Sequence, residues 1–195
     1  LTRHMLAAIV EQRVTQPEAF DALRWIIMRY GESAPFSGNS AQPPHLRVYP
    51  TAQVLATIPS WDWHRARVDS ARYSTVYRFT QRADALERLG ATGRIAHLAA
   101  ALDDIPGVGP WSVAETLQGF CGHPDAVSVG DYHLAHTVGF AFTGERTDDA
   151  GMLHLLAPYA GHRQRVVRLI QEAGIRKPRY GARIGIFNMR VEPVP

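Results

Sequence analysis

The chain has 195 residues, a formal net charge of +3 and a hydrophobic fraction of 46%. This length allows one domain, or two closely packed lobes, with a sizeable buried core. The mildly basic balance, with a pI near 9.3, permits nucleic-acid binding without requiring it. The single cysteine, Cys121, excludes a disulfide framework and any zinc or iron–sulfur site with four cysteine ligands.

Two helices are predicted within the first 30 residues. The first helix is expected to bury Leu6, Ile9 and Val10. It ends in the polar pair Gln12 and Arg13. Thr15 and Glu18 then form a capping box with a proline near the first turn, which predicts the start of a second helix. The buried stripe expected for this second helix is Phe20, Leu23, Ile27 and Tyr30.

Residues 31–50 are rich in Gly, Pro, Ser and Asn and have no periodicity, which is typical of a long surface loop. Thr51 is expected to cap a short helix after this loop. A longer helical segment is predicted from Trp61, and its arginines are Arg65, Arg67, Arg72 and Arg78. Such arginines can bind a nucleic-acid backbone, although a solvated helix face is the more common reason for them.

The stretch 102–118, LDDIPGVGPWSVAETLQ, has the pattern of a helix, a tight turn and a second helix. Pro106 and Pro110 lack N–H donors, and Gly107 and Gly109 allow positive φ, so no helix runs through this turn. Apolar residues at helical spacing flank it, namely Ile95, Leu98, Leu102 and Ile105 before it and Val113, Leu117 and Phe120 after it. The N–H groups of such a turn suit a phosphate oxygen, but an ordinary corner between two helices has the same pattern.

A second segment, residues 127–134, places an aspartate at a predicted helix start. A short apolar approach leads to Asp131, and a helical run follows it with Leu134, Val138 and Ala141 on the buried face. Backbone N–H groups at a helix start favour an ionised carboxylate. Taken alone, the segment fits a plain capping aspartate better than a functional one.

Two further helices are expected after Gly144. Thr147 caps the first, and the second buries Val166, Val167, Leu169 and Ile170. The tail 176–195 is basic and rich in Pro and Gly, so we expect it to be peripheral. Because no segment shows the alternation typical of strands, the predicted fold class is all-α.

The segments LDDIPGVGPWSVAETL and VSVGDYHL together resemble the helix-hairpin-helix (HhH-GPD) DNA glycosylase superfamily, the family of endonuclease III and 3-methyladenine DNA glycosylase II. Weaker similarity extends from the first helix to about residue 170. The resemblance implies a two-lobed helical architecture over residues 1–175, with the hairpin at 102–118 and the catalytic segment at 127–134. 3-Methyladenine DNA glycosylase II has an additional N-terminal domain, which we expect to be missing here.

The resemblance gives each candidate site residue a role. Asp131 matches the catalytic aspartate, whose carboxylate would stabilise an oxocarbenium-like sugar and orient a water. Trp111 would lie beside the active site and, like Tyr132, could offer an aromatic face to a flipped base. The residues expected to contact DNA are Gln12, Arg13, Gly107, Val108, Gly109 and Ser112. A buried tryptophan and a solvated helix end remain open as interpretations of Trp111 and of the pair Gln12–Arg13.

Bifunctional members of this family use a lysine as a Schiff-base nucleophile, two residues after the second hairpin glycine. That position is Trp111 here, and the one lysine of the chain is Lys177. The resemblance therefore implies a monofunctional enzyme. N-alkylated purines such as 3-methyladenine carry positive charge and need little general acid, which suits a sequence with no obvious acid beside Asp131.

No cofactor is expected to be required, and the single cysteine argues against the iron–sulfur cluster of many endonuclease III relatives. The resemblance implies that backbone carbonyls of Asp103, Ile105 and Val108 could hold a Na⁺ or K⁺ ion that also touches phosphate. His133 and His136 lie three residues apart, but no third ligand at matching spacing supports a metal site there.

Two classes of function remain open. One is a monofunctional DNA glycosylase of the 3-methyladenine type in base excision repair, and the other is a non-catalytic helix-hairpin-helix DNA-binding module. Asp131 discriminates between them, because a pure binder has no use for a carboxylate facing DNA. The expected partner is double-stranded DNA with a damaged base, bound by a monomer. With no secretion signal and no apolar run that could cross a membrane, a bacterial protein of this kind would be cytoplasmic and nucleoid-associated.

Overall fold

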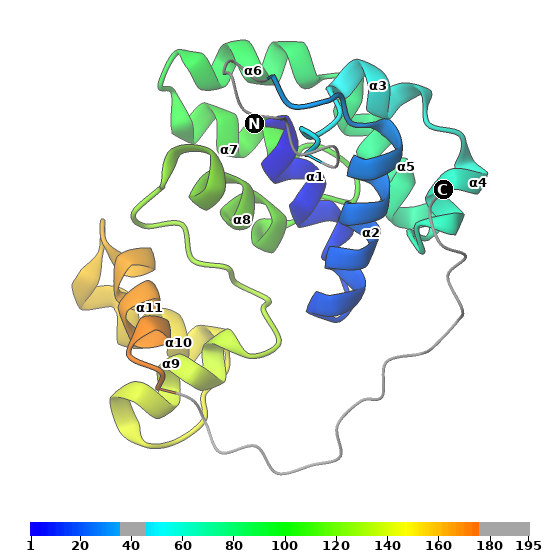
Figure 1. The fold of residues 1–195 in the computed structure, drawn as a ribbon. Coiled ribbons are helices and arrows are strands. Elements are labelled where there is room, and N and C mark those ends of the chain that lie inside the picture. Colours follow the sequence, from blue (N-terminus) through cyan, green and yellow to red (C-terminus); the bar gives the residue numbers. More distant parts are fainter. Residues whose placement is uncertain (36–45, 176–195) are drawn as a thin grey trace, which may run out of the picture. The chain divides into compact units, whose positions relative to one another are not determined.

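The computed structural model describes residues 1–35 and 46–175 (Figure 1). Over these residues the chain forms eleven α-helices and one short 3₁₀ turn. Ser33 and Arg47 form an isolated antiparallel β-bridge. The all-α prediction is therefore confirmed. The predicted tail 176–195 and residues 36–45 of the predicted loop lie outside the described residues.

The chain divides into two compact units, and the boundary falls between Val108 and Gly109, inside the predicted hairpin. The helices of the first unit are α1 (Thr2–Val10), α2 (Gln16–Tyr30), α3 (Ala52–Thr57), α4 (Ser60–Arg65), α5 (Ser70–Thr80), α6 (Ala83–Ala91) and α7 (Ile95–Asp103). Helix α5 is central to this unit, since it contacts α1, α3, α4 and α6. The largest fully buried side chains here are Met5, Leu6, Ile9, Val10, Ile26, Leu55, Phe79, Leu98, Leu102 and Ile105.

The start of α2 follows the prediction, but of the predicted buried stripe only Leu23 is fully buried. The Thr15 N–H donates to Glu18 Oε2 at 2.9 Å, as a capping box requires. The buried residues of α2 are Ala19, Ala22, Leu23 and Ile26, whereas Phe20 is 54% exposed. The prediction favoured the largest apolar side chains, while the helix turns its small alanines inward.

The long arginine-rich helix predicted from Trp61 is instead two helices, α4 and α5. Between them Arg67 has a φ of +60°, which no residue of an α-helix adopts. Asp69 caps α5, because its carboxylate accepts the N–H of Arg72 at 3.0 Å. The caps of Thr51 and Asp69 thus mark the true helix starts in this region.

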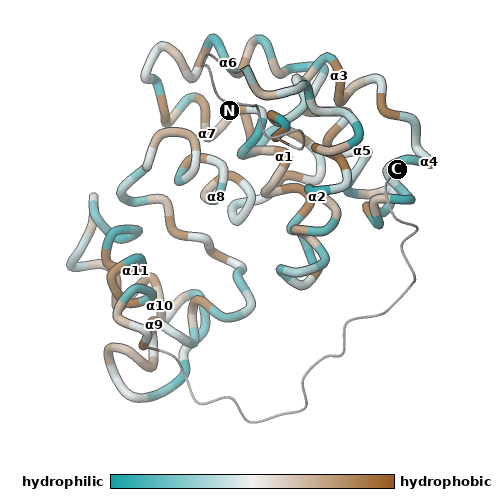
Figure 2. Tube along the Cα trace, viewed as in Figure 1, coloured by the Kyte–Doolittle hydropathy of each residue, from teal (hydrophilic) through white to brown (hydrophobic). Residues whose placement is uncertain are grey.

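The second unit contains α8 (Pro110–Cys121), α9 (Leu134–Thr143), α10 (Asp149–Leu156), the 3₁₀ turn η1 (Ala157–Tyr159) and α11 (Arg163–Glu172). Helix α9 contacts both α10 and α11. Their shared core consists of Val127, Leu134, Ala135, Val138, Met152, Leu156, Val167 and Ile170. Figure 2 shows hydrophobic and hydrophilic residues mixed along the chain in this unit, as expected for helices that bury one face.

Two predictions in this unit are wrong in detail. Helix α10 is capped by Asp148, whose carboxylate accepts the N–H of Gly151 at 2.8 Å, and not by Thr147. Leu169 is 69% exposed, because it lies on the opposite side of α11 from the buried Val167 and Ile170.

Arg163 at the start of α11 forms an ion pair with Asp125, which ties this helix to the loop after α8.

Candidate functional site

In the first unit, the hairpin turn after α7 is closed by its own backbone and lies directly against α5. The Val108 N–H donates to Ile105 O at 2.9 Å. Gly107 has a φ of +95°, and a Cβ atom at this position would lie 2.1 Å from Thr75 Oγ1. Only glycine fits both conditions. Val108 is buried at 8% exposure, so its predicted contact with DNA could be made by its backbone alone.

The end of α1 lies beside this turn. The side-chain amide of Gln12 donates to Gly107 O at 3.0 Å, and Arg78 Nη1 of α5 donates to Pro106 O at 3.2 Å. Arg13 next to Gln12 is exposed and has a φ of +57°, an uncommon conformation for a residue other than glycine. The structure thus brings Gln12 and Arg13, both expected to contact DNA, together with the first half of the turn expected to bind phosphate.

The side chain of Arg72 stabilises the end of α1, a role that the sequence did not suggest. Its guanidinium is buried and donates to Val10 O at 2.7 Å, to Arg67 O at 2.9 Å and to the Asp69 carboxylate at 2.8 Å. It therefore fixes the last turn of α1, from which Gln12 and Arg13 follow. The Asp-x-x-Arg spacing at a helix start is the sequence signal that could have identified this role.

In the second unit, α8 begins directly after the hairpin. Gly109 precedes the helix with an extended backbone, Pro110 occupies the first helical position, and the Val113 N–H donates to Gly109 O at 3.0 Å. A Cβ atom on Gly109 would meet nothing within 4 Å. Ser112 is 2% exposed, so its side chain points inward and its predicted contact with DNA would use the backbone N–H.

Asp131 lies at the start of α9, as predicted. Its Oδ1 atom accepts the N–H groups of His133 and Leu134, each at 2.8 Å, and the side chain is partly exposed. The preceding residue, Gly130, has a φ of +90° and donates its N–H to Asp149 Oδ2 at 3.1 Å. These bonds hold the carboxylate in one orientation at the end of a short, defined turn.

One face of α8 is bound to the segment before Asp131 by a chain of polar side chains. Gln164 Nε2 of α11 donates to Gln118 Oε1 at 2.8 Å, and Gln118 Nε2 donates to Ser128 Oγ at 2.8 Å and to Ala126 O at 2.8 Å. The Ser128 hydroxyl then donates to Glu115 Oε1. Glu115 and Gln118, three residues apart, therefore face the segment 126–131.

Glu115 is a further carboxyl on this face of α8, bonded to Ser128 three residues before Asp131, where the sequence offered no obvious acid. Burial raises the pKa of Glu115, the Ser128 hydrogen bond opposes this change, and the negative charge of Asp131 raises the pKa further. Nothing in the sequence indicated this role, because the rest of α8 and a loop separate Glu115 from Asp131 and Glu115 matches no motif residue.

The two predicted aromatic residues differ in exposure. Trp111 lies four residues before Glu115 and so on the same face of α8, and it is partly exposed rather than buried. Tyr132 is 83% exposed and meets the His133 ring edge-on, with ring centroids 4.8 Å apart. Of these two aromatic residues, Trp111 is therefore the one that shares a helix face with Glu115.

The geometry of the hairpin turn is compatible with the predicted cation site. Ile105 O already accepts the Val108 N–H, yet a carbonyl oxygen has a second lone pair. The carbonyls of Asp103, Ile105 and Val108 as ligands of a Na⁺ or K⁺ ion therefore stay a prediction. Among the described residues, no group of three His, Cys, Asp or Glu side chains could hold a metal ion.

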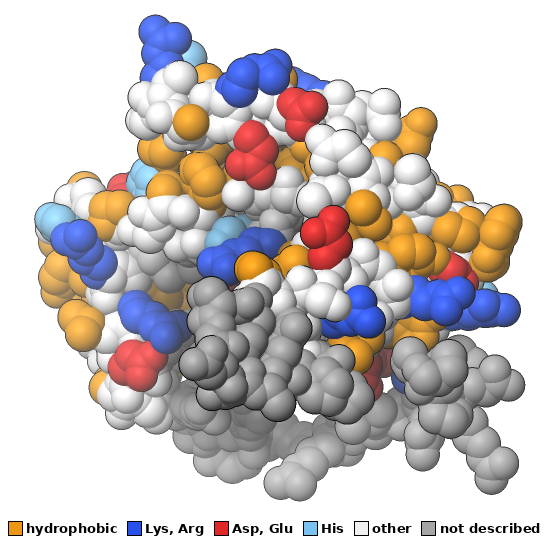
Figure 3. Space-filling view, turned by 45° about the horizontal axis from the view of Figure 1, so that its top comes forward, with side chains coloured by type: hydrophobic (Ala, Val, Ile, Leu, Met, Phe, Trp, Pro, Cys, Tyr) orange, Lys and Arg blue, Asp and Glu red, His pale blue; other side chains and the backbone are white. Residues whose placement is uncertain are grey.

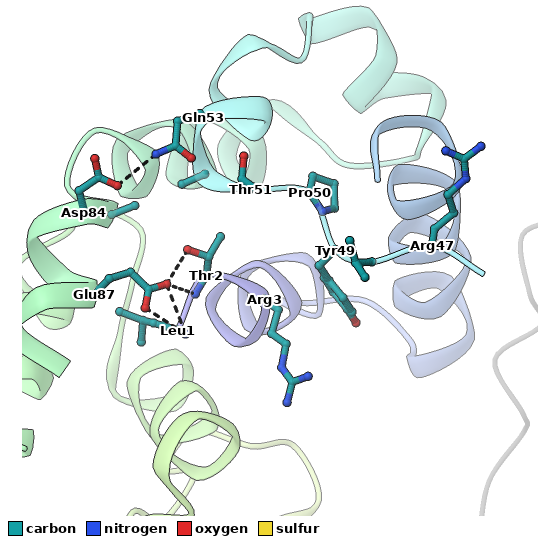
Figure 4. A pocket seen from close by; sticks show the side chains of 13 residues that line it. Leu1, Thr2, Arg3, Arg47, Tyr49, Pro50, Thr51, Gln53, Asp84 and Glu87 are labelled. Atoms are coloured by element: carbon teal, nitrogen blue, oxygen red, sulfur yellow. Dashed lines mark hydrogen bonds and ion pairs between the residues drawn. The ribbon is translucent and has the colours of Figure 1, made fainter. Parts of the chain in front are cut away.

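A hollow of about 610 Å³ in the first unit contains none of the predicted site residues. Figure 4 shows Glu87 directed toward Leu1 and Thr2, where it accepts the Thr2 N–H at 3.0 Å, while Gln53 donates to Asp84 at 3.2 Å. Four of its polar residues, Thr2, Gln53, Asp84 and Glu87, are thus engaged with one another. On the face shown in Figure 3, arginine side chains lie among carboxylates and apolar groups rather than in one basic patch. Of the helices described, none is long and apolar enough to span a bilayer.

Comparison with known proteins identifies the fold. No family model matches the sequence, and no curated protein does. The 3-methyladenine DNA glycosylase of Archaeoglobus fulgidus superposes with a TM-score of 0.70 at 14% identity, over 89% of this chain and 58% of that one. The 8-oxoguanine glycosylase/lyase of Clostridium acetobutylicum, bound to double-stranded DNA, gives a TM-score of 0.65 at 14% identity, over 89% and 61%. The DNA-3-methyladenine glycosidase of Bacillus halodurans gives 0.64 at 15% identity, over 88% and 74%.

The chain therefore has the fold of the helix-hairpin-helix DNA glycosylases, as the hairpin and the aspartate segment predicted. It spans less than two thirds of the length of the first two structures. These similar structures include both a 3-methyladenine enzyme and an 8-oxoguanine glycosylase/lyase, so the fold alone does not select a substrate.

Proposed function

We propose that this chain is the helical part of a monofunctional DNA glycosylase of base excision repair, which hydrolyses the N-glycosidic bond of a damaged base in double-stranded DNA. The observation that carries the proposal is the carboxylate of Asp131, which the N–H groups of His133 and Leu134 hold in one orientation, at the end of a segment that is hydrogen-bonded to α8 through Ser128. A DNA-binding module needs no carboxylate beside the helix that follows its hairpin.

The residues would act in a simple order. Backbone N–H groups of the hairpin and of the first turn of α8 would bind phosphate, which positions the duplex without regard to sequence. A cation held by the carbonyls of Asp103, Ile105 and Val108 would add a further phosphate contact. Trp111 would stack on the flipped base, and Asp131 would stabilise positive charge on the sugar and orient the attacking water.

The position of Trp111 supports the monofunctional assignment. A lyase needs an amine that forms a Schiff base with the sugar, and an indole ring has no such nucleophile. We expect alkylated purines such as 3-methyladenine among the substrates, because their positive charge already activates the leaving base and attracts an electron-rich aromatic face.

The proposal is tested by incubating the full chain with methylated duplex DNA and separating the released bases by chromatography. Release of 3-methyladenine or 7-methylguanine, at a rate that depends on Asp131, is the expected result. Measurement of binding to the same duplex distinguishes the alternative. A protein that binds DNA but releases no base would be the non-catalytic helix-hairpin-helix module.

A further inference from the structure

Arg78 of α5 is an exposed cation that the structure places at the hairpin turn. Its Nη1 atom donates to Pro106 O at 3.2 Å, and the bond lies at the protein surface. Thr75, one turn earlier on α5, lies directly against the same turn, since a Cβ atom on Gly107 would be 2.1 Å from its Oγ1 atom. The fully buried Phe79 anchors this part of α5 in the core of the first unit. A well-packed helix therefore holds the guanidinium beside the turn.

Two other arginines of this helical region have partners within the protein. Arg65 of α4 donates to the Asp62 carboxylate at 3.3 Å, and the guanidinium of Arg72 is buried. Arg78 differs from both, because it forms no ion pair with any carboxylate of the described residues. A guanidinium carries five N–H donors, and the bond to Pro106 O uses one of them. Its charge and its remaining donors are therefore open to a ligand from outside.

The turn needs such a charge if it is to bind an anion. Pro106 has no N–H group, and the Val108 N–H is taken by a carbonyl within the turn. Asp103 and Asp104, just before the turn, are exposed carboxylates whose negative charge opposes the approach of a phosphate. Arg78 is the cationic side chain that is hydrogen-bonded to this turn, so it offsets their charge at the place where a phosphate would bind.

We propose that Arg78 is a phosphate-binding residue, whose guanidinium bridges Pro106 O of the hairpin turn and a phosphate group of the DNA backbone beside it. A guanidinium can present two parallel N–H groups to a phosphate, and such charge-assisted bonds are stronger than bonds between neutral groups. Pro106 O is not among the carbonyls predicted to hold a cation, so both groups can be bound together. The inference rests on the proposed binding of DNA at the hairpin and does not require base removal.

The salt dependence of binding separates a phosphate contact from a purely structural role. Each phosphate that a cationic side chain neutralises releases counterions, so the slope of log affinity against log salt concentration changes by about 0.9 per contact. Affinity for a short undamaged duplex is measured by fluorescence anisotropy from about 50 to about 200 mM KCl. Arg78→Gln should make the slope shallower by about 0.9 and lower the affinity about tenfold, equally for unrelated sequences.

Arg3→Gln is the matched control, because it removes the same charge at an exposed position of the same unit. Arg3 lies in the first turn of the nine-residue helix α1, roughly 13 Å along the axis from the end that contacts the hairpin. Exposed charges are largely screened over this distance at about 0.1 M salt, so its slope should equal that of the parent. Arg78→Lys keeps the charge without the planar fork, so it should keep the slope and lose affinity only a few-fold.

An unchanged slope in Arg78→Gln, or the same change in Arg3→Gln, would overturn the inference. Arg78 would then serve only to hold the turn against α5. The proposed function would remain standing, because release of bases from methylated duplex is measured separately.

A second measurement uses the parent chain, so it does not depend on how Arg78→Gln folds. Phenylglyoxal modifies accessible guanidinium groups, and peptide mass spectrometry gives the extent of modification at each arginine. Bound duplex should protect Arg78 several-fold and leave Arg3 as reactive as before. Equal modification of Arg78 with and without bound duplex would overturn the inference. Protection of Arg78 in a chain that releases no base would support the inference and refute the proposed function, and a chain that binds no duplex would refute both.

Discussion

The side-chain amide of Gln12 donates a hydrogen bond to the carbonyl oxygen of Gly107 at 3.0 Å, joining residues that are 95 positions apart in the sequence. Gln12 follows the last turn of α1, and Gly107 lies in the hairpin turn after α7. This bond holds the end of α1 against the turn, and the hydrogen bond of Arg78 to Pro106 O holds the turn against α5. Two parts of the first unit that are expected to contact DNA, the end of α1 and the hairpin turn, are therefore held against each other.

The two hairpin glycines should behave differently when substituted. Gly107→Ala forces a side chain into positive φ and against Thr75 Oγ1, so we expect a loss of about 1–3 kcal/mol in the free energy of unfolding. Gly109→Val meets open space and an extended backbone, so the fold should be kept. Because the added bulk keeps phosphate away from the turn, affinity for DNA should fall roughly tenfold or more.

Binding of Gly109→Val to several unrelated duplexes, measured by fluorescence anisotropy, checks this expectation. The loss should be similar for every duplex, because phosphate contacts carry no sequence information. Ala85→Val places the same bulk on an exposed face of α6 and should bind like the parent. Unchanged affinity in Gly109→Val would show that the turn does not contact DNA.

The ion pair of Asp125 with Arg163 should make stability depend on pH. The Arg163 side chain, by hydrogen bonding, holds the pKa of the Asp125 carboxyl well below its usual range. The resulting stabilisation is present above the unfolded pKa, about 3.9, and is lost as pH falls through the lower folded pKa. Asp125→Asn should therefore cost about 1–3 kcal/mol at pH 7, and this difference from the parent should shrink steadily below about pH 4.

Urea unfolding of Asp125→Asn and the parent across this pH range gives the measurement. The exposed pair of Arg168 and Glu172 offers a comparison, because its removal by Glu172→Gln should cost only about 0.3–0.5 kcal/mol. A loss in Asp125→Asn no larger than in this variant would mean that the ion pair adds no more to stability than an exposed pair, and that other contacts, such as the hydrogen bonds of Pro124 O, hold the loop after α8.

Base removal should not be coupled to strand cleavage. Since Trp111 stands where a lyase of this fold has its lysine, incubation with damaged duplex and borohydride should trap no covalent complex. A glycosylase/lyase acting on the same DNA serves as the positive control. A trapped adduct would assign the chemistry to another amine, such as the N-terminus or Lys177, which lies outside the described residues.

The sequence predicted the parts of this molecule that depend on local rules. Prolines and glycines mark the hairpin, and threonine and aspartate caps mark the starts of α2, α3 and α9, because such signals act within four residues. Helix faces were predicted less well. Phe20 and Leu169 were expected to be buried but are exposed. The buried face of a helix depends on the elements that pack against it, and periodicity does not identify those elements.

The candidate site was only half predictable for a related reason. Asp131 stands in a recognisable segment, but Glu115 is joined to Ser128 of that segment only through the packing of α8 on residues 126–128. Arg72 was expected on a solvated or DNA-binding helix face, whereas its guanidinium is buried and donates to Val10 O at the end of α1. Both residues act through contacts with distant backbone or side chains, and a single sequence carries no record of those contacts.

The rate of base release by Asp131→Asn tests the central claim most directly. Asparagine keeps the shape of the side chain and an oxygen that can accept the N–H groups of His133 and Leu134, so folding and DNA binding should persist. The charge that stabilises the sugar is gone, and single-turnover release of 3-methyladenine from methylated duplex should fall by roughly 100-fold or more. Release within a few-fold of the parent rate, by a variant with unchanged thermal unfolding and DNA affinity, would contradict the assignment of Asp131 as the catalytic carboxylate.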